Sequence, residues 1–481
     1  MVSKFVREQK RYTQNELCLI LECTETEVIG YIRKLKEYGV LKAVKASDLQ
    51  RDLSELQEED IEIADVEISE NMYLYVFTFV GVIVVSGRAL KCYPKYLLSK
   101  ENPTAELQQI IKVLEKYNAK EQIVHMFNDS SESQSFNLLA VLLFLLQDYY
   151  ENGVYTNTTD IIENNGIGEI LWEKTINETF TLISNNRPYY TELQTKRRMS
   201  DEFDYFKRLH ECIVTRASSE LKDADLIDLF EITEIDVSDE ELDDFGDTDY
   251  ILYRIENELN TQFNTRKQLV LKTLYAYIKH SGNLYDVDCL SIFGTNSFNL
   301  VWESVCADIM DNQLDRTLGS LTLPIPLKPE YDKHIKLVEV IEKPEWTITG
   351  KNAKDTLIPD LITISESSNG YDFVIFDAKY YNAKLDVNIQ PKGQPGIESI
   401  TKQYLYQLAY QKFISDHEFS KVRNCFLMPT EEDDVIEKGE ARMCMLEKLG
   451  LQNIKVRFLP AAMAYSYYLS GRKMDISKLK L

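Results

Sequence analysis

The sequence has few of the features that build disulfide frameworks, zinc sites or membrane spans. Its eight cysteines form no C-x-x-C pair and its five histidines do not cluster near them, so a zinc site and a disulfide framework are both disfavoured. The longest apolar runs, Tyr75–Val85 and Leu138–Leu146, are too short to cross a bilayer. Met1–Lys10 is charged and lacks the apolar core of a signal peptide. We therefore expect a protein of the reducing cytoplasm that does not enter a membrane.

The sequence also lacks an excess of positive charge and a nucleotide-binding loop. Its net charge is −24, and phosphate contacts come from Lys and Arg, so any contact with nucleic acid must be local rather than spread over the surface. No G-x-x-x-x-G-K-[ST] motif occurs, because Gly350-Lys351 lacks both the first glycine and the hydroxyl residue. The chain therefore carries no P-loop of its own.

What is present is the composition of a globular protein of several domains. With 481 residues, 44% hydrophobic and 27% charged, the chain exceeds one compact core and predicts about two to four domains. We expect a multidomain α+β protein. Its predicted parts are a winged-helix or helix-turn-helix unit (1–46), a small β-rich unit (60–100), a helical scaffold domain (101–285) and a C-terminal α/β domain (286–481).

The N-terminal segment has helix signals and a local excess of positive charge. Thr13 can cap a helix through Leu21, and Thr24–Glu27 has the form of a capping box. Gly39 then ends the second helix ahead of a strand. Nine Lys or Arg face six Glu from residue 1 to residue 45. The second helix carries side chains that are candidates for DNA contact, although winged helices also dock proteins. These candidates are Arg33, Lys34 and Lys36.

The middle of the chain predicts a few strands and then mostly helices. Strands are expected at Tyr73–Phe79 and Val80–Ser86, with a third that ends at Tyr93. Between Glu220 and Asp249 fourteen acids face Lys222 alone, which indicates a solvated acidic face or a surface that docks a basic partner. Helical periodicity follows the strands in Leu107–Tyr117, Phe136–Tyr150, Glu169–Asn185, Asp201–Arg216 and Tyr250–Lys279.

A predicted hairpin places charged side chains among apolar ones. Leu357–Ile364 and Tyr371–Lys379 read as strands, separated by turn residues. The second strand looks covered on both faces, yet it carries Asp377 and Lys379, and burying such groups is costly unless they have partners. If Asp360 comes alongside, two carboxylates converge next to one ammonium, and a divalent cation would relieve their repulsion. The alternative is a surface salt bridge on an ordinary hairpin.

Two helices flank this hairpin in the sequence. Ser297–Asp311 has an apolar stripe, and Glu303 lies on its flank, where an acid can reach an active site or remain a solvated glutamate. Ile400–Ile414 carries an uncharged polar stripe that can support an active site by hydrogen-bonding phosphate oxygens or water. The alternative for this second stripe is a tyrosine-rich packing face. Its members are Gln403, Tyr406, Gln407 and Tyr410.

Pro359-Asp360 followed by Asp377-Ala378-Lys379 resembles the PD-(D/E)XK nuclease superfamily. The resemblance implies an α/β core with a mixed central sheet flanked by helices, and a Mg²⁺ site in which Mn²⁺ can substitute. Asp360, Asp377 and the carbonyl of Ala378 would hold the metal in oxygen ligands. Lys379 would orient or deprotonate the attacking water with a pKa lowered by burial. Glu303 matches the acidic residue that a preceding helix supplies to the metal in that superfamily.

A further set of motifs is similar to the LlaJI-type restriction endonucleases, relatives of the McrC subunit. It is strongest in the C-terminal domain and more diffuse upstream. This resemblance implies the cleavage subunit of a restriction system that acts on double-stranded DNA with a separate McrB-like AAA+ GTPase, which would bind GTP, and with a second copy for duplex cleavage. A stand-alone type II restriction enzyme and a non-catalytic DNA-binding or adaptor protein remain alternatives. The motifs are Phe376–Tyr381, Pro395-Gly396, Lys402–Gln407, Phe79–Ile83 and Tyr93–Tyr96.

Overall fold

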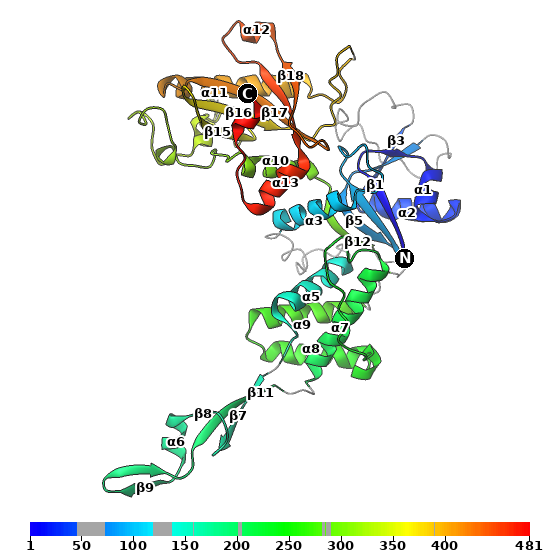
Figure 1. Cartoon of the computed structure of the whole chain (residues 1–481), viewed down its shortest axis with the longest axis vertical. Coiled ribbons are helices and arrows are strands. Elements are labelled where there is room, and N and C mark those ends of the chain that lie inside the picture. Colours follow the sequence, from blue (N-terminus) through cyan, green and yellow to red (C-terminus); the bar gives the residue numbers. More distant parts are fainter. Residues whose placement is uncertain are drawn as a thin grey trace. The chain divides into compact units, whose positions relative to one another are not determined.

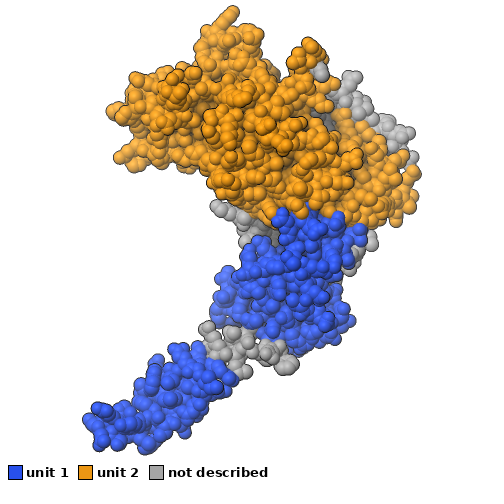
Figure 2. Space-filling view, viewed as in Figure 1, with its two compact units in different colours: residues 1, 84–87, 132–291 blue, residues 2–83, 88–131, 292–481 orange. Residues whose placement is uncertain are grey.

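A computed structural model describes most of the chain in two compact units. Unit 1 comprises residues 1, 84–87 and 132–291, and unit 2 comprises residues 2–83, 88–131 and 292–481 (Figure 2). The predicted boundaries at residues 46, 60, 285 and 286 fall outside the described residues, and the division into four domains stays a prediction. The described residues are 1–45, 73–118, 137–156, 158–200, 204–280, 284, 290–388 and 390–481.

The N-terminal part of unit 2 holds two capped helices and a small antiparallel sheet. Thr13 and Thr24 each accept a hydrogen bond from the backbone of the glutamate three residues on, and each glutamate closes a capping box, which confirms the predicted helix starts. The sheet has the order β2-β4-β3. The winged-helix assignment stays a prediction. The elements are β2 (Arg11–Tyr12), α1 (Gln14–Leu21), α2 (Glu25–Glu37), β3 (Leu41–Lys45) and β4 (Tyr73–Phe77).

A second sheet, of order β1-β6-β5-β12, joins segments that are far apart in the sequence. β1 (Val2–Arg7) pairs in parallel with β6 (Arg88–Tyr93), so the chain start is a strand of this sheet. β5 (Val80–Val85) lies beside β12 (Leu290–Thr295). Gly81 is required at this pairing, because a Cβ there would lie 2.1 Å from the carbonyl oxygen of Phe293. The glycine in the Phe79–Ile83 motif therefore permits close strand approach.

Unit 1 contains most of the predicted helices and a segment made mainly of strands (Figure 1). Four helices match predicted ones, with 250–279 divided in two: α5 (Leu138–Asn152), α7 (Tyr205–Asp223), α8 (Thr248–Thr261) and α9 (Thr265–Lys279). The helix predicted at Glu169–Asn185 is wrong beyond α6, since strands follow. Asn185 and Asn186 have φ of 52° and 61°, as in a two-residue hairpin turn. The segment holds β7 (Thr158–Asn164), β8 (Glu169–Ile170), α6 (Trp172–Glu178), β9 (Thr181–Ser184), β10 (Arg187–Tyr190) and β11 (Gln194–Ser200).

The C-terminal part of unit 2 is built on a mixed five-stranded sheet of order β15-β16-β17-β19-β18. The inner pairs β16/β17 and β17/β19 are parallel, and the outer pairs are antiparallel. Helix α11 packs on one face, where Tyr410 and Phe413 meet Phe373 in one core cluster, and α10 and α13 lie on the other side (Figure 1). The elements are α10 (Phe298–Ile309), β15 (Leu361–Ser367), β16 (Gly370–Ala378), α11 (Ile397–Asp416), β17 (Lys421–Thr430), β18 (Ile436–Ala441), β19 (Ile454–Pro460) and α13 (Ala461–Ser470).

The remaining elements are short, apart from one helix of unit 2. That helix, α3 (Thr104–Asn118), matches a predicted one and packs near α13, where Gln109 donates a hydrogen bond to the carbonyl oxygen of Ala462. Within the described residues, no helix is both long and apolar enough to cross a membrane. The short elements are η3 (Leu242–Phe245), η4 (Leu318–Ser320), η5 (Leu337–Val340), β13 (Glu345–Trp346), β14 (Lys351–Asn352), α12 (Cys444–Glu447) and η6 (Ile476–Leu479).

Candidate active site

The predicted hairpin is present, with a first strand that starts and ends later in the chain and with a tighter turn than expected. β15 runs to Ser367 and β16 starts at Gly370, so the turn is shorter than the predicted stretch from Ser365 to Gly370. Leu361 pairs with Phe376, and Asp360 directly precedes β15 instead of lying within it. Continuing the same register brings Asp360 opposite Asp377.

The two aspartates meet at the end of the strand pair. Oδ2 of Asp360 accepts a hydrogen bond of 2.9 Å from the backbone nitrogen of Ala378. Asp377 is buried and Asp360 is half-buried. Burial raises the pKa of Asp377, and a hydrogen bond to Asp360 and the charge of that neighbour raise it further, while Lys379 lowers it. Asp360 therefore disfavours the ionisation of Asp377.

Lys379 completes the set and stays positively charged. Its Nζ lies 2.8 Å from Oδ1 of Asp377. Burial lowers the pKa of Lys379, but the charge of Asp377, a hydrogen bond to it and the charge of Asp360 together raise the pKa above its usual value. The expectation of a lysine whose pKa is lowered by burial is therefore wrong, because two acids surround the ammonium group. An ammonium that keeps its proton can orient water and balance negative charge.

Glu303 comes to this group from α10. The predicted apolar stripe of α10 is buried, and Trp302 within it donates a hydrogen bond of 3.2 Å to the carbonyl oxygen of Leu427. Glu303 is half-buried on the flank. Burial raises its pKa to about 7, the charge of Asp360 adds to this rise, and Lys379 opposes it. Glu303 therefore lies close enough to Asp360 and Lys379 for their charges to change its pKa, unlike a glutamate surrounded by solvent.

The polar stripe of α11 divides between two places. Gln403 is fully buried and its Nε2 donates a hydrogen bond of 3.0 Å to the carbonyl oxygen of Ile375 on β16. Burial raises the pKa of Tyr406 to about 12, and the charges of Asp377 and Asp360 contribute, so this ring lies near the carboxylates. The stripe packs on the sheet, while Leu405 and Leu408 of the same helix are exposed.

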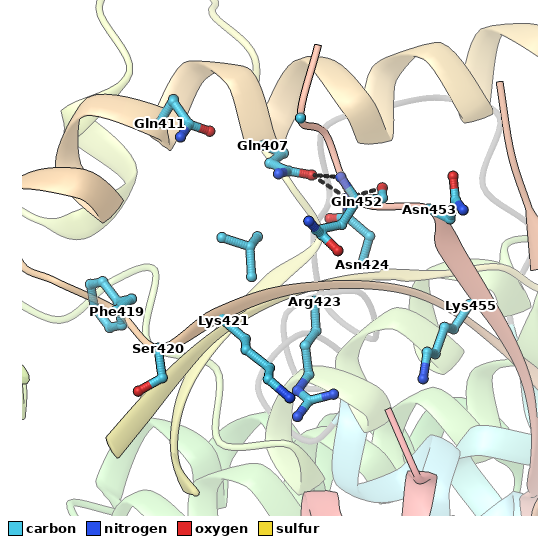
Figure 3. Close-up of a pocket in the computed structure, with 12 residues that line it drawn as sticks. Gln407, Gln411, Phe419, Ser420, Lys421, Arg423, Asn424, Gln452, Asn453 and Lys455 are labelled. Atoms are coloured by element: carbon cyan, nitrogen blue, oxygen red, sulfur yellow. Dashed lines mark hydrogen bonds between the residues drawn. The ribbon is translucent and has the colours of Figure 1, made fainter. Parts of the chain in front are cut away.

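Gln407 belongs to a separate cavity of about 570 Å³ (Figure 3). Its Oε1 accepts hydrogen bonds from Nδ2 of Asn424 and the backbone nitrogen of Gln452. The β17 residues that line this cavity pair with the first half of β16, whereas Leu427 pairs with Ala378 at the other end. Gln407 therefore lies away from the carboxylates.

The candidate DNA-contacting residues lie on another element. Arg33 is exposed on α2, the helix that also carries Lys34 and Lys36. Figure 1 shows α1 and α2 apart from β15 and β16. Contact of these residues with DNA stays a prediction.

The structure also brings together residues to which the sequence assigned no role. Tyr380, directly after Lys379, donates a hydrogen bond to Oε2 of Glu8, and the Nζ of Lys95 lies 4.5 Å from the centre of its ring. Lys95 belongs to the Tyr93–Tyr96 motif, which marked it without indicating a role. Glu8 had no signal, because its partner is far away in the sequence.

The residues at the end of β16 fit a hard divalent cation. Oδ1 of Asp377 is buried, and the Lys379 ammonium group lies 2.8 Å from it. A carboxylate oxygen has two lone pairs, so the same group can also serve as a metal ligand. Across the described ranges, no group of three or more His, Cys, Asp or Glu is arranged to hold a metal by itself. Mg²⁺ is commonly held by one or two carboxylates, with water and phosphate oxygens as its other ligands. The pair Asp360 and Asp377, with a backbone carbonyl, suits that mode.

Comparisons with known proteins give a family and some distant relatives. Residues 79–326 and 327–451 match the family of LlaJI restriction endonucleases. The chain is 25% identical, over 99% of its length and 91% of the relative's, to the "Type II restriction enzyme BsuMI component YdjA" of Bacillus subtilis. Two solved assemblies of Thermococcus gammatolerans are also similar. One, McrB AAA+ hexamers with bound McrC, has a TM-score of 0.39 and 12% identity over 98% of this chain and 99% of that one. The other, the McrBC complex, has a TM-score of 0.26 and 13% identity over 63% and 85%.

The family match spans most of the chain, from the Gly81 strand through the hairpin to residue 451, just before β19. It includes Glu303, Asp360, Asp377 and Lys379, and it exceeds half of the 481 residues. The chain therefore belongs to the LlaJI restriction endonuclease family.

Proposed function

We propose that this chain is the DNA-cleaving subunit of an antiviral restriction system and a Mg²⁺-dependent endodeoxyribonuclease of the PD-(D/E)XK type. One observation carries the proposal. The hairpin register brings Asp360 opposite Asp377, and the Lys379 ammonium group lies 2.8 Å from a buried Asp377 oxygen. An ordinary surface salt bridge does not combine a buried carboxylate with a second, half-buried one beside it. Membership of a restriction endonuclease family agrees with this chemistry.

The side chains divide the work of phosphodiester hydrolysis. Asp360, Asp377 and the Ala378 carbonyl would hold Mg²⁺ or Mn²⁺, with Glu303 as a direct or water-bridged ligand. When bound, the metal polarises the scissile phosphate. Lys379, as an ammonium ion, orients the attacking water and offsets the charge that develops on the phosphate. The water oxygen forms the new bond to phosphorus and loses a proton to surrounding water, while the bond to the leaving oxygen breaks and that oxygen takes up a proton from surrounding water.

We further propose that cleavage depends on partners. The described residues hold one such site, and one site cuts one strand, so duplex cleavage needs a second copy. Its sequence has no P-loop, so any GTP-driven step would come from a separate McrB-like AAA+ GTPase, as the family resemblance implies. The curated relative is itself named as a component of a restriction enzyme. Arg33, Lys34 and Lys36 on α2 are the proposed local contacts to DNA phosphates or base edges.

Cleavage of methylated and unmethylated plasmid tests this proposal. Purified chain is incubated with Mg²⁺, alone and with the companion AAA+ protein and GTP, and compared with the Asp377→Ala and Lys379→Ala variants. We expect cutting with the full set and none with either variant. Efficient site-specific cutting by the chain with Mg²⁺ alone would indicate a stand-alone enzyme. If the wild-type protein binds DNA but cuts it in none of these mixtures, the chain is a non-catalytic adaptor.

Metal binding gives a readout that does not depend on cleavage. Isothermal titration with Mg²⁺ or Mn²⁺ should give binding to the wild-type protein and a large loss of affinity for Asp377→Ala. Equal affinity for both proteins would place the metal elsewhere.

A further inference from the structure

A buried polar cluster lies directly behind the candidate catalytic lysine. Tyr380, the residue after Lys379, is 7% exposed, and its hydroxyl donates a hydrogen bond to Oε2 of Glu8. The same Glu8 oxygen accepts a hydrogen bond of 3.2 Å from the backbone nitrogen of Lys95. Glu8 follows β1 and Lys95 follows β6, the parallel pair of the N-terminal sheet. One carboxylate oxygen therefore joins that sheet to the end of the catalytic strand.

Lys95 contacts the same tyrosine from the face of its ring. Its Nζ lies 4.5 Å from the centre of the Tyr380 ring and donates a hydrogen bond of 3.1 Å to Oε1 of Gln9. Lys95 is 8% exposed, so little water competes with this cation–π contact. A carboxylate at the hydroxyl and an ammonium group over the ring thus determine both the position and the tilt of Tyr380.

Two further aromatic rings surround Tyr380. The ring of Phe298, in the first turn of the helix that carries Glu303, lies 5.3 Å from it. The ring of Tyr96 lies 6.2 Å away, edge to face, and its hydroxyl pairs at 2.9 Å with that of Tyr465. Tyr380 is therefore held from several elements at once.

The position of Tyr380 matters because β16 ends just before it. Ala378 is the last residue of the strand, and the Lys379 nitrogen donates a hydrogen bond of 2.9 Å to the carbonyl oxygen of Leu427. Beyond that bond, the next anchored side chain is Tyr380. The backbone of Lys379 is thus held between the sheet on one side and the tyrosine on the other, which restricts where its ammonium group can reach.

The stability of the fold does not by itself explain why Glu8, Lys95 and Tyr380 form a buried polar cluster. Burying a carboxylate and an ammonium group costs several kcal/mol per ion before pairing, and well-packed apolar side chains often serve the fold equally well. A polar cluster instead specifies one geometry, since its hydrogen bonds have defined directions. The cluster therefore suits a task in which placement counts, and its neighbour is the lysine of the candidate active site.

We propose that Glu8 and Lys95 are positioning residues for cleavage, which hold Tyr380 and thereby set Lys379 against Asp377. This inference rests on the proposed nuclease function. It makes the N-terminal sheet a working part of the active site, and it gives the Tyr93–Tyr96 motif a role. Positioning errors of about 1 Å cost on the order of 100-fold in rate, so a loosened Tyr380 should slow cutting without removing any metal ligand.

The test uses full-length variants that change single groups of the cluster. Tyr380→Phe removes the hydroxyl that donates a hydrogen bond to Glu8. Lys95→Met removes the ammonium group and keeps an unbranched side chain of similar length. Tyr465→Phe is the matched control, because it removes another buried tyrosine hydroxyl of the cluster that pairs with Tyr96 and not with Glu8. The single-turnover rate is measured under the partner and nucleotide conditions in which the wild-type protein cuts, together with the Mg²⁺ half-saturation, the DNA Kd and the urea midpoint.

We expect Tyr380→Phe and Lys95→Met to lower the single-turnover rate by about 10- to 100-fold, with Mg²⁺ half-saturation and DNA Kd within about twofold of wild type. The rate of the control, Tyr465→Phe, should stay within about threefold of the wild-type rate, although this variant should lose about as much stability as Tyr380→Phe. Glu8→Gln, which keeps an acceptor, should recover part of the rate lost in Glu8→Ala.

Two results overturn the positioning role. One is a wild-type rate for Tyr380→Phe while Asp377→Ala is inactive. The other is a rate that falls equally in the control, in step with stability. If Asp377→Ala cuts normally, the proposed function fails instead, so the two failures are distinguishable.

Discussion

Two buried aspartates on one strand should respond oppositely to the same substitution. Asp377 and Asp372 both lie on β16, and each side chain is 4% exposed. Asp372 has a conventional partner, because its Oδ2 lies 2.7 Å from Nε of Arg423 and its Oδ1 accepts a hydrogen bond from Ser367. Asp377 faces Lys379 at 2.8 Å but also a second carboxylate, and burial together with Asp360 raises its pKa although Lys379 opposes the rise. Asp→Asn at each position is therefore a matched pair.

The expected free energies follow from these surroundings. Asp372→Asn removes the charge that Arg423 faces, which should lower the free energy of unfolding by about 2 kcal/mol, less than for a fully buried pair because the Arg423 side chain is 24% exposed. A carboxyl group whose pKa is higher in the folded than in the unfolded chain lowers the free energy of unfolding at any pH above its unfolded-state pKa. Asp377→Asn removes that penalty, so the metal-free variant should be as stable as wild type or more stable, by up to about 2 kcal/mol.

Cleavage should follow the opposite order. Asp377→Asn removes a proposed metal ligand and should lower the rate by at least about 1,000-fold, or roughly 4 kcal/mol. Asp372→Asn should stay within about threefold, since its partner Arg423 lies on the first half of β17, away from the Leu427 end.

Urea unfolding at pH 7.5 with EDTA, followed by tryptophan fluorescence, measures the stability of the nuclease core. Trp302 is fully buried there, while Trp172 and Trp346 are 54% and 67% exposed and contribute less change. A loss of stability in Asp377→Asn as large as that in Asp372→Asn would refute the reasoning, because it would make Asp377 an ordinary ion-pair residue.

Other predictions concern single side chains and the partner. Glu303→Gln should lower the cleavage rate by about 100-fold or more if its charge serves the metal, and near-wild-type turnover at low Mg²⁺ would make it a surface residue. His210 is fully buried, accepts a hydrogen bond at Nδ1 from the Tyr155 nitrogen, and burial lowers its pKa from 6.5 to about 4. Below pH 6.5 this histidine is protonated in the unfolded chain but stays neutral in the folded one. The free energy of unfolding should therefore fall by about 2 kcal/mol between pH 7.5 and pH 5 because of this residue, and His210→Gln should not show this part of the decrease. With a net charge of −24, the isolated chain should bind duplex DNA weakly and lose affinity steeply with salt, whereas the companion GTPase with GTP should switch cleavage on; salt-independent binding by the chain alone would contradict this.

The sequence by itself determined the features that depend on neighbouring residues. Thr13 and Thr24 cap helices because a hydroxyl and a glutamate three residues on satisfy backbone groups of the same turn. Alternating apolar residues on both sides of a short turn sufficed to place the hairpin, and the antiparallel register then brought Asp360 opposite Asp377. The apolar stripe of α10 likewise predicted which side of that helix is buried.

The sequence misled where local pattern and tertiary packing disagree. Leu405 and Leu408 form the more apolar side of α11, yet that side is exposed and the tyrosine and glutamine side packs on the sheet, where Gln403 hydrogen-bonds to Ile375. Glu169–Asn185 has helical periodicity, but the turn at Asn185-Asn186 closes a strand pair instead. Hydrophobicity alone does not tell which face meets a sheet that offers buried polar partners.

Tertiary structure alone decided the contacts made between distant segments. The charge of Lys379 depends on acids from two strands, and the reach of Glu303 to Asp360 depends on how α10 packs. The bond from Tyr380 to Glu8 spans 372 positions in the sequence. Such pairs leave no periodic signal, because their geometry comes from strand order and helix packing over the whole chain, whereas caps, turns and stripes arise from residues within a few positions of one another.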